Sequence, residues 1–214
     1  FGMHYHDAML WGSVVMLAYT FFGGFLAVSW SDVLQGSLMF IALVMVAAMG
    51  IAMTGGLGDM TAALEARNPA LLDPFVGGDG QAIGWIGVLS LVAWGLSSPA
   101  QPHILACVMA IRNAGVMPTA RRAAMGWVIV VLVAAIIVGL TGVLLLDPPL
   151  TGPDSEKVFI VMSGQYLHPV LAGICMSGIL AAIMSTASAQ LLVASSACAE
   201  DFYKGIFRRN PGRA

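Results

Sequence analysis

The stretch VIVVLVAAIIVGLTGVLLL, residues 128–146, decides the fold class of this chain. It is apolar almost without interruption, and it is far longer than the strand of roughly ten alternating residues from which membrane β-barrels are built. A helix needs about 20 such residues to cross the hydrocarbon core of a bilayer, which is roughly 30 Å thick. The segment therefore predicts a membrane-spanning α-helix.

The composition extends that prediction to the whole chain. Of the 214 residues, 59% are hydrophobic and 9% are charged, whereas a soluble domain carries about a quarter charged residues. So few charges cannot coat a water-soluble surface, and the chain is not basic enough to bind nucleic acid. We expect the lipid bilayer as its surroundings and an all-α polytopic membrane helix bundle as its fold class.

Apolar runs between polar breaks divide the chain into spans of a single transmembrane domain. The chain opens at Phe1 without a Met, and no basic segment precedes the first apolar run. We therefore expect residues 1–214 to be an internal fragment of a single transmembrane domain. About five transmembrane helices are predicted, at residues 8–29, 33–54, 82–110, 124–146 and 168–198.

The segments outside these spans differ in charge. Seven of the nine Lys and Arg residues fall within residues 111–123 and 199–214, whereas residues 55–81 and 147–167 are net acidic. The positive-inside rule therefore predicts that 111–123 and 199–214 are cytoplasmic and that the two acidic loops are external. Loop 55–81 is rich in Gly and Pro, which favours an irregular structure.

Two local features add smaller predictions. The segment SEKVFIVMSGQY, residues 155–166, predicts a short external helix, with Asp154 or Ser155 as its cap. The three cysteines lie inside or at the ends of apolar spans and show no metal-ligand spacing. We expect them to be small core residues, because free Cys is usually buried: they are Cys107, Cys175 and Cys198.

The third span contains WGLSSPAQPH, residues 94–103, and is predicted to break there. Pro99 and Pro102 each remove a backbone donor and clash with the preceding turn, which leaves carbonyl groups unpaired. Non-helical backbone at membrane depth persists where it is buried in protein or lines a polar cavity. A simple proline kink is the alternative. Trp94 lies near the middle of this span, where it either packs in the core or walls a substrate site.

The fifth span carries a face of hydroxyl groups. In membrane helices such groups usually bond back to a carbonyl one turn earlier or allow close helix packing. The alternative is a cation site, because Ala182, Ser185 and Thr186 place one carbonyl and two hydroxyls side by side. Neutral oxygen ligands suit a hard alkali cation. The hydroxyl face comprises Ser177, Ser185, Ser188, Ser195 and Ser196.

Asp32 lies in SWSDVLQ, residues 29–35, at the expected junction of the first two spans. An acidic residue is unusual there. It can cap the N-terminus of the second span, where Asp is favoured and complements the helix dipole. It can also take part in a cation pathway, and the residue pattern leaves both interpretations open.

At these residues the chain resembles the sodium:solute symporter family, and in particular its sodium/proline branch. The resemblance implies the leucine-transporter type of inverted-repeat fold, in which these helices are the fourth to eighth core helices and the broken span lies near a midplane substrate site. The stretches that carry it are YTFFGGFLAVSWSDVLQGSLM, WGLSSPAQPHILACVMA followed by ARR, and GILAAIMSTASAQLLVASSACAEDFYK.

The resemblance also implies roles for individual residues. The family's sodium site takes the carbonyl of Ala182 and the hydroxyls of Ser185 and Thr186, and its acidic position for cation passage is Asp32. Where the proline transporters carry a tyrosine in the broken segment, this chain has a serine, so the pocket loses one aromatic wall. The expected substrate-binding residues are Trp94, Ser98, Gln101 and Pro102.

The predicted function is sodium-coupled symport of a small organic solute, proline or a related amino acid, by alternating access in a bacterial inner membrane. The coupling ion is Na⁺, and no organic cofactor is expected. A symporter of the same family for another solute is the nearest alternative. A membrane enzyme built on His103 or His168, or a channel or sensory domain, fits less well, because neither His has an intramembrane partner at catalytic or metal spacing.

Overall fold

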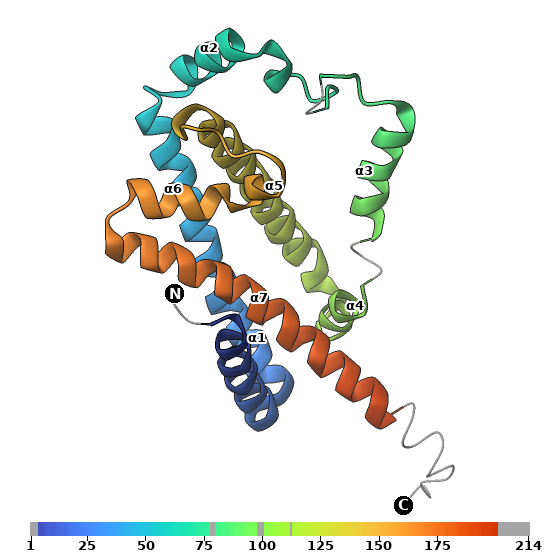
Figure 1. The fold of residues 1–214 in the computed structure, drawn as a ribbon. Helices are drawn as coiled ribbons and strands as arrows, with labels where there is room; N and C mark the ends of the chain where they lie inside the picture. Colours follow the sequence, from blue (N-terminus) through green and yellow to red (C-terminus); the bar gives the residue numbers. More distant parts are fainter. Residues whose placement is uncertain (1–3, 78–79, 98–100, 112, 201–214) are drawn as a thin grey trace, which may run out of the picture. The chain divides into compact units, whose positions relative to one another are not determined.

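The structure of this chain is a computed structural model that describes residues 4–77, 80–97, 101–111 and 113–200 (Figure 1). Within these ranges the chain is helical, and its one β feature is an isolated bridge between Val76 and Ala82. Helices long and apolar enough to cross a membrane are Tyr5–Met53, Ala114–Leu145 and Pro169–Glu200. An all-α, polytopic membrane fold is thereby confirmed, while the number of five spans and the inverted-repeat arrangement stay predictions.

Helix α1, Tyr5–Met53, contains the first two expected spans, but it bends at Gly24 and not at residues 30–32. Gly24 has φ 53° and ψ −145°, a conformation that is open to glycine and strained for other residues. Figure 1 shows the sharp change of direction in the blue helix. The polar residues that follow need no break, because the Ser29 and Ser31 hydroxyls donate to helix carbonyls one turn earlier at 2.8 and 2.9 Å.

This position of the bend overturns the capping role considered for Asp32. The helix runs through Asp32 without interruption, so its carboxylate meets no free N-terminal N–H groups. The part of Asp32 in a cation pathway stays a prediction.

The loop expected to be irregular contains a helix. Gly55 and Gly56 end α1 with φ of 86° and 110°, and α2, Leu57–Arg67, follows directly. The sequence pattern did not predict this helix, because what stabilises α2 is the burial of two side chains, Met60 and Leu64, on one face. The short 3₁₀ helix η1, Pro69–Leu72, comes next.

The third expected span is interrupted as predicted. Helix α3, Trp85–Ser97, ends before the prolines, and α4, Pro102–Met109, begins at one. Gln101 is the extended N-cap residue of α4, with φ −70° and ψ 128°. Ser98 and Pro99 lie outside the described residues.

Helix α5, Met117–Leu145, follows the 3₁₀ helix η3, Ala114–Val116. Side chains from two other helices donate to carbonyl groups in its last turn. Arg67 Nη1 donates to the Val143 carbonyl at 2.6 Å, and the Tyr166 hydroxyl donates to the Leu145 carbonyl at 2.5 Å. These bonds satisfy carbonyls that a helix end otherwise leaves without a partner.

The predicted short helix is present as α6, Val158–Tyr166, preceded by the 3₁₀ helix η4, Gly152–Lys157, while its external placement stays a prediction. The predicted cap is wrong, because the N-cap residue is Lys157 and no side chain bonds there. Asp154 instead forms an ion pair with Lys157 at 2.7 Å. The Ser155 hydroxyl donates to the Gly152 carbonyl.

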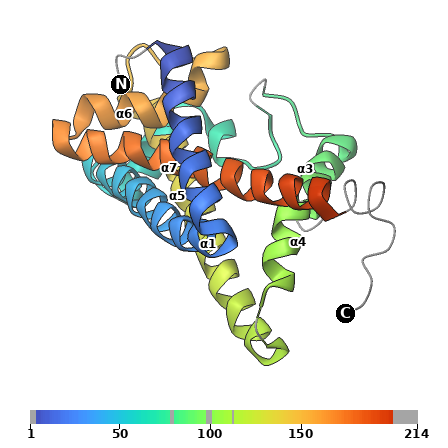
Figure 2. The ribbon, with the colours of Figure 1, turned by 90° about the horizontal axis from the view of Figure 1, so that it is seen from below.

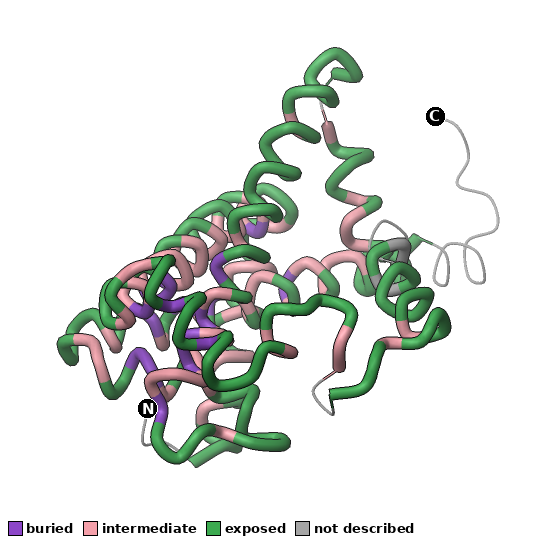
Figure 3. The backbone as a smooth tube through the Cα atoms, turned by 90° about the horizontal axis from the view of Figure 1, so that it is seen from above, coloured by how far each residue is buried: buried purple, intermediate pink, exposed green. Residues whose placement is uncertain are grey.

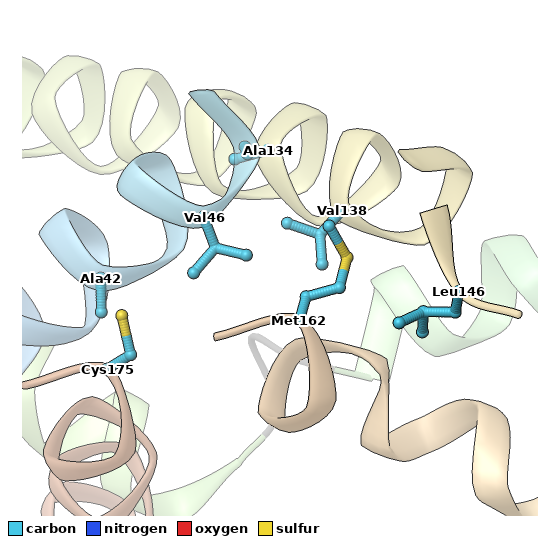
Figure 4. Close-up of a cluster of buried hydrophobic side chains, with 8 residues drawn as sticks. Ala42, Val46, Ala134, Val138, Leu146, Met162 and Cys175 are labelled. Atoms are coloured by element: carbon cyan, nitrogen blue, oxygen red, sulfur yellow. The ribbon is translucent and has the colours of Figure 1, made fainter. Parts of the chain in front are cut away.

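The last helix is α7, Pro169–Ala197. The chain divides into two compact units, the first formed by the described residues of 1–37, 99–110 and 180–214, the second by those of 38–98 and 111–179. The second unit holds the main cluster of buried apolar side chains (Figure 4), and Figure 3 shows that exposed positions predominate elsewhere along the helices. The labelled members of that cluster are Ala42, Val46, Ala134, Val138, Leu146, Met162 and Cys175.

The cysteines follow the prediction only in part. Cys175 is buried in this cluster, whereas Cys107 and Cys198 are exposed. Cys107 lies on α4, a short helix that buries none of its residues fully.

Candidate functional site

Three helix segments of the first unit line a small pocket. They come from α1, α4 and the C-terminal half of α7, and Figure 2 shows α4 beside that half of α7. The pocket volume is about 10 Å³, roughly the space that one water molecule or a small ion occupies. An amino acid does not fit. Its polar lining consists of Ser29, Asp32, His103 and Cys107.

Asp32 links this pocket to the predicted sodium ligands. Its carboxylate interacts with the side chain of Ser185 on α7 and lies within electrostatic range of His103 on α4. Its Oδ1 atom is buried without a hydrogen-bond partner among the described atoms. A carboxylate placed this way in a membrane protein is costly unless it serves a cation or a polar path.

The other two predicted ligands are already in contact with each other. The Thr186 hydroxyl donates to the Ala182 carbonyl at 3.1 Å, and Ser185 is partly buried on the adjacent position of the helix. The Thr186 hydroxyl keeps lone pairs beyond the bond that it donates, whereas the Ala182 carbonyl also accepts the backbone N–H of residue 186 within the helix. The three residues therefore present oxygen atoms on neighbouring positions of one helix, as the spacing predicted.

For most of the hydroxyl face the plainer interpretation is confirmed. Ser177, Ser188 and Ser195 donate to carbonyls three or four residues earlier, at 2.9, 3.0 and 2.9 Å. Such bonds satisfy a hydroxyl without any ligand. Ser185 differs from them, because its side chain meets the Asp32 carboxylate.

The predicted substrate-binding residues are divided between the two units of the chain. Trp94 lies on α3 in the second unit, and its side chain is outside the description, as is Ser98. Gln101 and Pro102 are exposed at the start of α4 in the first unit. Their assignment to a substrate site stays a prediction.

Comparison with known protein families identifies the family of this chain. The model of the sodium:solute symporter family matches residues 1–213. The chain belongs to the sodium:solute symporter family. This membership, together with the three apolar helices, makes it part of a multi-pass membrane protein.

Several relatives of this symporter-family chain have descriptive names. It is 43% identical over 210 residues to a high-affinity proline transporter of Bacillus subtilis strain 168, which covers 98% of this chain and 43% of the relative. It is 40% identical over 215 residues to a sodium/proline symporter of Escherichia coli K12, covering 98% and 42%. The chain thus spans about two fifths of the length of these relatives. No solved structure matches it.

Membership of a symporter family sets aside the less favoured alternative of a membrane enzyme built on His103 or His168. His168 precedes α7, where its Nδ1 accepts a hydrogen bond from the backbone N–H of Val170 at 3.4 Å. His103 was not connected with Asp32 from the sequence, although they lie at one pocket. The one sequence signal that bears on this is the spacing of His103 and Cys107, which places both side chains on one face of a helix.

Proposed function

We propose that this chain is part of a sodium-coupled symporter for a small organic solute, proline or a related amino acid, that works by alternating access. Na⁺ binds at the Ala182 carbonyl and at the hydroxyls of Ser185 and Thr186, and Asp32 lies on the cation path. Further ligands come from helices outside this chain. Family membership and relatives named as proline transporters support this proposal.

The observation that carries the proposal is the contact between the Asp32 carboxylate and the Ser185 side chain. One member of the ligand set thereby meets a negative charge from another helix. Such a charge lowers the free-energy cost of bringing a cation into a membrane-embedded site, and the neutral oxygen atoms replace the water molecules that surround the cation. The pocket of about 10 Å³ that Asp32 lines fits an ion and not an amino acid.

The membrane potential supplies the drive for transport. One positive charge that moves inward gains roughly 2.3 kcal/mol per 100 mV, and each 1.4 kcal/mol is about a tenfold concentration ratio. One sodium ion per cycle therefore suffices for more than tenfold accumulation of a neutral solute.

The solute site is proposed at the interruption between α3 and α4, with Trp94, Ser98, Gln101 and Pro102 as its residues. Ser98 supports a second candidate, namely sodium symport of a solute other than proline. It stands where the proline branch of the family carries a tyrosine, so a pocket formed there would lose one aromatic wall. A bulkier or more polar solute would suit that pocket better.

The proposed location is a bacterial inner membrane, with residues 111–123 and 199–214 in the cytoplasm. The cluster of seven cationic residues in these two segments supports that orientation. Reaction of introduced cysteines with an impermeant reagent in intact cells tests it: Asn113→Cys should stay unreacted, and Asn68→Cys in the external loop should react.

The test of the function is uptake of labelled proline by the full-length protein in proteoliposomes. An inward Na⁺ gradient should drive accumulation, and an equal K⁺ gradient should not. Competition by unlabelled amino acids then ranks the solutes. Na⁺-dependent uptake of another solute alone favours the second candidate, and the absence of Na⁺ dependence with every solute contradicts the proposal.

A further inference from the structure

Two arginines near the start of α5 have no role in the proposed function. Arg121 and Arg122 are both exposed, and no ion pair joins either of them to a described residue. Arg122 Nε donates to the Pro118 carbonyl of its own helix at 3.3 Å, which leaves the other N–H groups of this guanidinium open. Two neighbouring positive charges therefore lie at the surface of the second unit without an acidic partner among the described residues.

Trp127 indicates the depth of these arginines in the membrane. Its ring stacks on Phe40 of α1, with ring centroids 6.2 Å apart and an interplanar angle of 27°. Trp is enriched at the membrane interface, because its ring is apolar and its N–H group is polar. Arg122 precedes Trp127 by five residues, on the side away from the apolar part of α5, which is a rise of about 7.5 Å along a helix. The guanidinium groups are therefore at the level of the phospholipid headgroups.

One face of α5 continues from Arg122 as an open apolar surface. Successive spacings of four and three residues place its members on the same side of the helix. A Cβ added at Gly126, one turn after Arg122, meets nothing within 4 Å, so the surface is lowest directly beside the charge. The residues that continue this face are Ile129, Val133 and Ile136, which are 56%, 51% and 61% exposed.

The charge and the length of this face fit a phospholipid with an anionic headgroup. Its phosphate meets the two guanidinium groups, whose N–H donors match phosphate oxygen atoms. From Gly126 to Ile136 the helix rises about 15 Å, which is half of a hydrocarbon core roughly 30 Å thick and thus the depth that the acyl chains of one leaflet fill. Another transmembrane helix would cover the apolar residues equally well, but it offers no phosphate to the arginines.

We propose that Arg121, Arg122 and the face of α5 that begins at Gly126 bind a phospholipid with an anionic headgroup, such as phosphatidylglycerol. The headgroup phosphate pairs with the arginines, the glycerol part fills the space over Gly126, and an acyl chain follows the apolar residues. This binding goes beyond the proposed function, because it requires neither sodium nor a transported solute.

The test measures lipid binding to the full-length protein in an uncharged detergent. Phosphatidylglycerol and phosphatidylcholine with the same acyl chains are added in turn, and the melting temperature and the lipids retained in native mass spectrometry are recorded. Phosphatidylglycerol should raise the melting temperature at a concentration at least about tenfold lower than phosphatidylcholine needs. Its half-saturating concentration should rise about fivefold when one arginine is replaced by Gln and more than tenfold in Arg121→Gln/Arg122→Gln.

Matched variants separate this site from general effects of charge and size. Lys157→Gln removes an exposed cation of η4 and should leave phosphatidylglycerol binding within about twofold of the unmodified protein. Gly126→Leu fills the space beside the arginines and should weaken binding about as much as loss of one arginine. Ala124→Leu adds the same side chain at an exposed position nearly opposite on the helix and should not. The melting temperature without added lipid shows that each variant folds.

The outcomes decide the proposal independently of transport. Weaker phosphatidylglycerol binding in the arginine variants and in Gly126→Leu, with both controls unaffected, supports it. Unchanged binding in Arg121→Gln/Arg122→Gln or in Gly126→Leu overturns it, as does equal binding of phosphatidylcholine. Inorganic phosphate at the same concentration should leave the melting temperature unchanged, and equal stabilisation by phosphate would overturn the assignment to a lipid. Proline uptake is not a readout here, so a failure of symport and a failure of lipid binding are recognised separately.

Discussion

The carboxylate of Asp32 on α1 faces the side chain of Ser185 on α7, although most of the chain separates the two residues. Ser185 also belongs to the proposed sodium ligands. The negative charge on α1 therefore lies next to one of the proposed neutral ligands on α7. A cation bound there is stabilised by both, since Coulomb attraction at about 4 Å is worth several kcal/mol at an effective dielectric constant of about 20.

The first prediction concerns that charge. Asp32→Asn keeps the shape of the side chain and removes the negative charge, so the Na⁺ concentration of half-maximal uptake should rise by at least about tenfold, or ~1.4 kcal/mol. Asp32→Glu keeps the charge and should show a smaller rise. Uptake kinetics in proteoliposomes measure both, and an unchanged Na⁺ dependence in Asp32→Asn would remove Asp32 from the cation path.

The second prediction concerns the neutral ligands. Ser185→Ala and Thr186→Ala each remove one oxygen atom, and each should raise the half-saturating Na⁺ concentration about five- to tenfold. Ser195→Ala is the matched control, because it removes a back-bonded hydroxyl of the same helix that lies outside the proposed ligand set. It should stay within about twofold of the unmodified protein. Equal effects in all three variants would point to general damage to α7.

The third prediction tests the packing of the second unit. A Cβ added at Gly142 of α5 would clash with the Val158 side chain of α6, whereas one added at Gly126 of the same helix meets nothing within 4 Å. Gly142→Ala should therefore destabilise the protein by about 1–3 kcal/mol. Gly126→Ala should be neutral or stabilising by up to about 1 kcal/mol, because alanine favours the helix. Thermal unfolding in detergent compares them, and equal melting temperatures would refute the close approach.

The fourth prediction concerns the end of α5. Tyr166→Phe removes the hydroxyl that donates to the Leu145 carbonyl, and Arg67→Met removes the donor to the Val143 carbonyl at 2.6 Å. Each should cost about 1 kcal/mol, with a lower melting temperature. The control is Lys157→Met, which breaks an ion pair between exposed side chains and should change the melting temperature very little.

The fifth prediction gives the pH range over which that ion pair acts. The hydrogen bond and charge of Lys157 hold the pKa of Asp154 below its ordinary value, and Asp154 raises the pKa of Lys157. The stabilisation that ionised Asp154 contributes is present above the pKa of this carboxyl group in the unfolded chain. It is lost as pH falls through the lower pKa that the group has in the folded protein. The stabilisation that charged Lys157 contributes is present below the pKa of its ammonium group in the unfolded chain. It is lost as pH rises through the higher pKa that the group has in the folded protein. The melting-temperature difference between the unmodified protein and Asp154→Asn should thus be constant from about pH 5 to 9, and a change near pH 6–7 would contradict this assignment.

The sequence predicted the helical class and the interruption at residues 94–103 because both follow from strong local signals, apolar length and proline. It misplaced the bend in α1 for an equally physical reason. Hydropathy changes at Ser29 and Asp32, but the hydroxyl of Ser29 is satisfied inside the helix. The bend needs a positive φ, which Gly24 provides within an apolar stretch.

The candidate site was predicted to a different extent. The oxygen atoms of Ala182, Ser185 and Thr186 share one helix, so spacing alone placed them side by side. The neighbourhood of Asp32 and His103 depends on packing between α1, α4 and α7. No local pattern encodes which helices meet, and this part therefore required the structure.

The most direct measurement of the central claim is simultaneous flux of Na⁺ and proline in proteoliposomes that contain the full-length protein. Coupled symport predicts that external proline starts Na⁺ entry, that the two fluxes keep a fixed ratio, and that Ser185→Ala/Thr186→Ala loses both together while Ser195→Ala keeps both. Na⁺ entry that ignores proline, or proline entry that ignores Na⁺, would contradict the account.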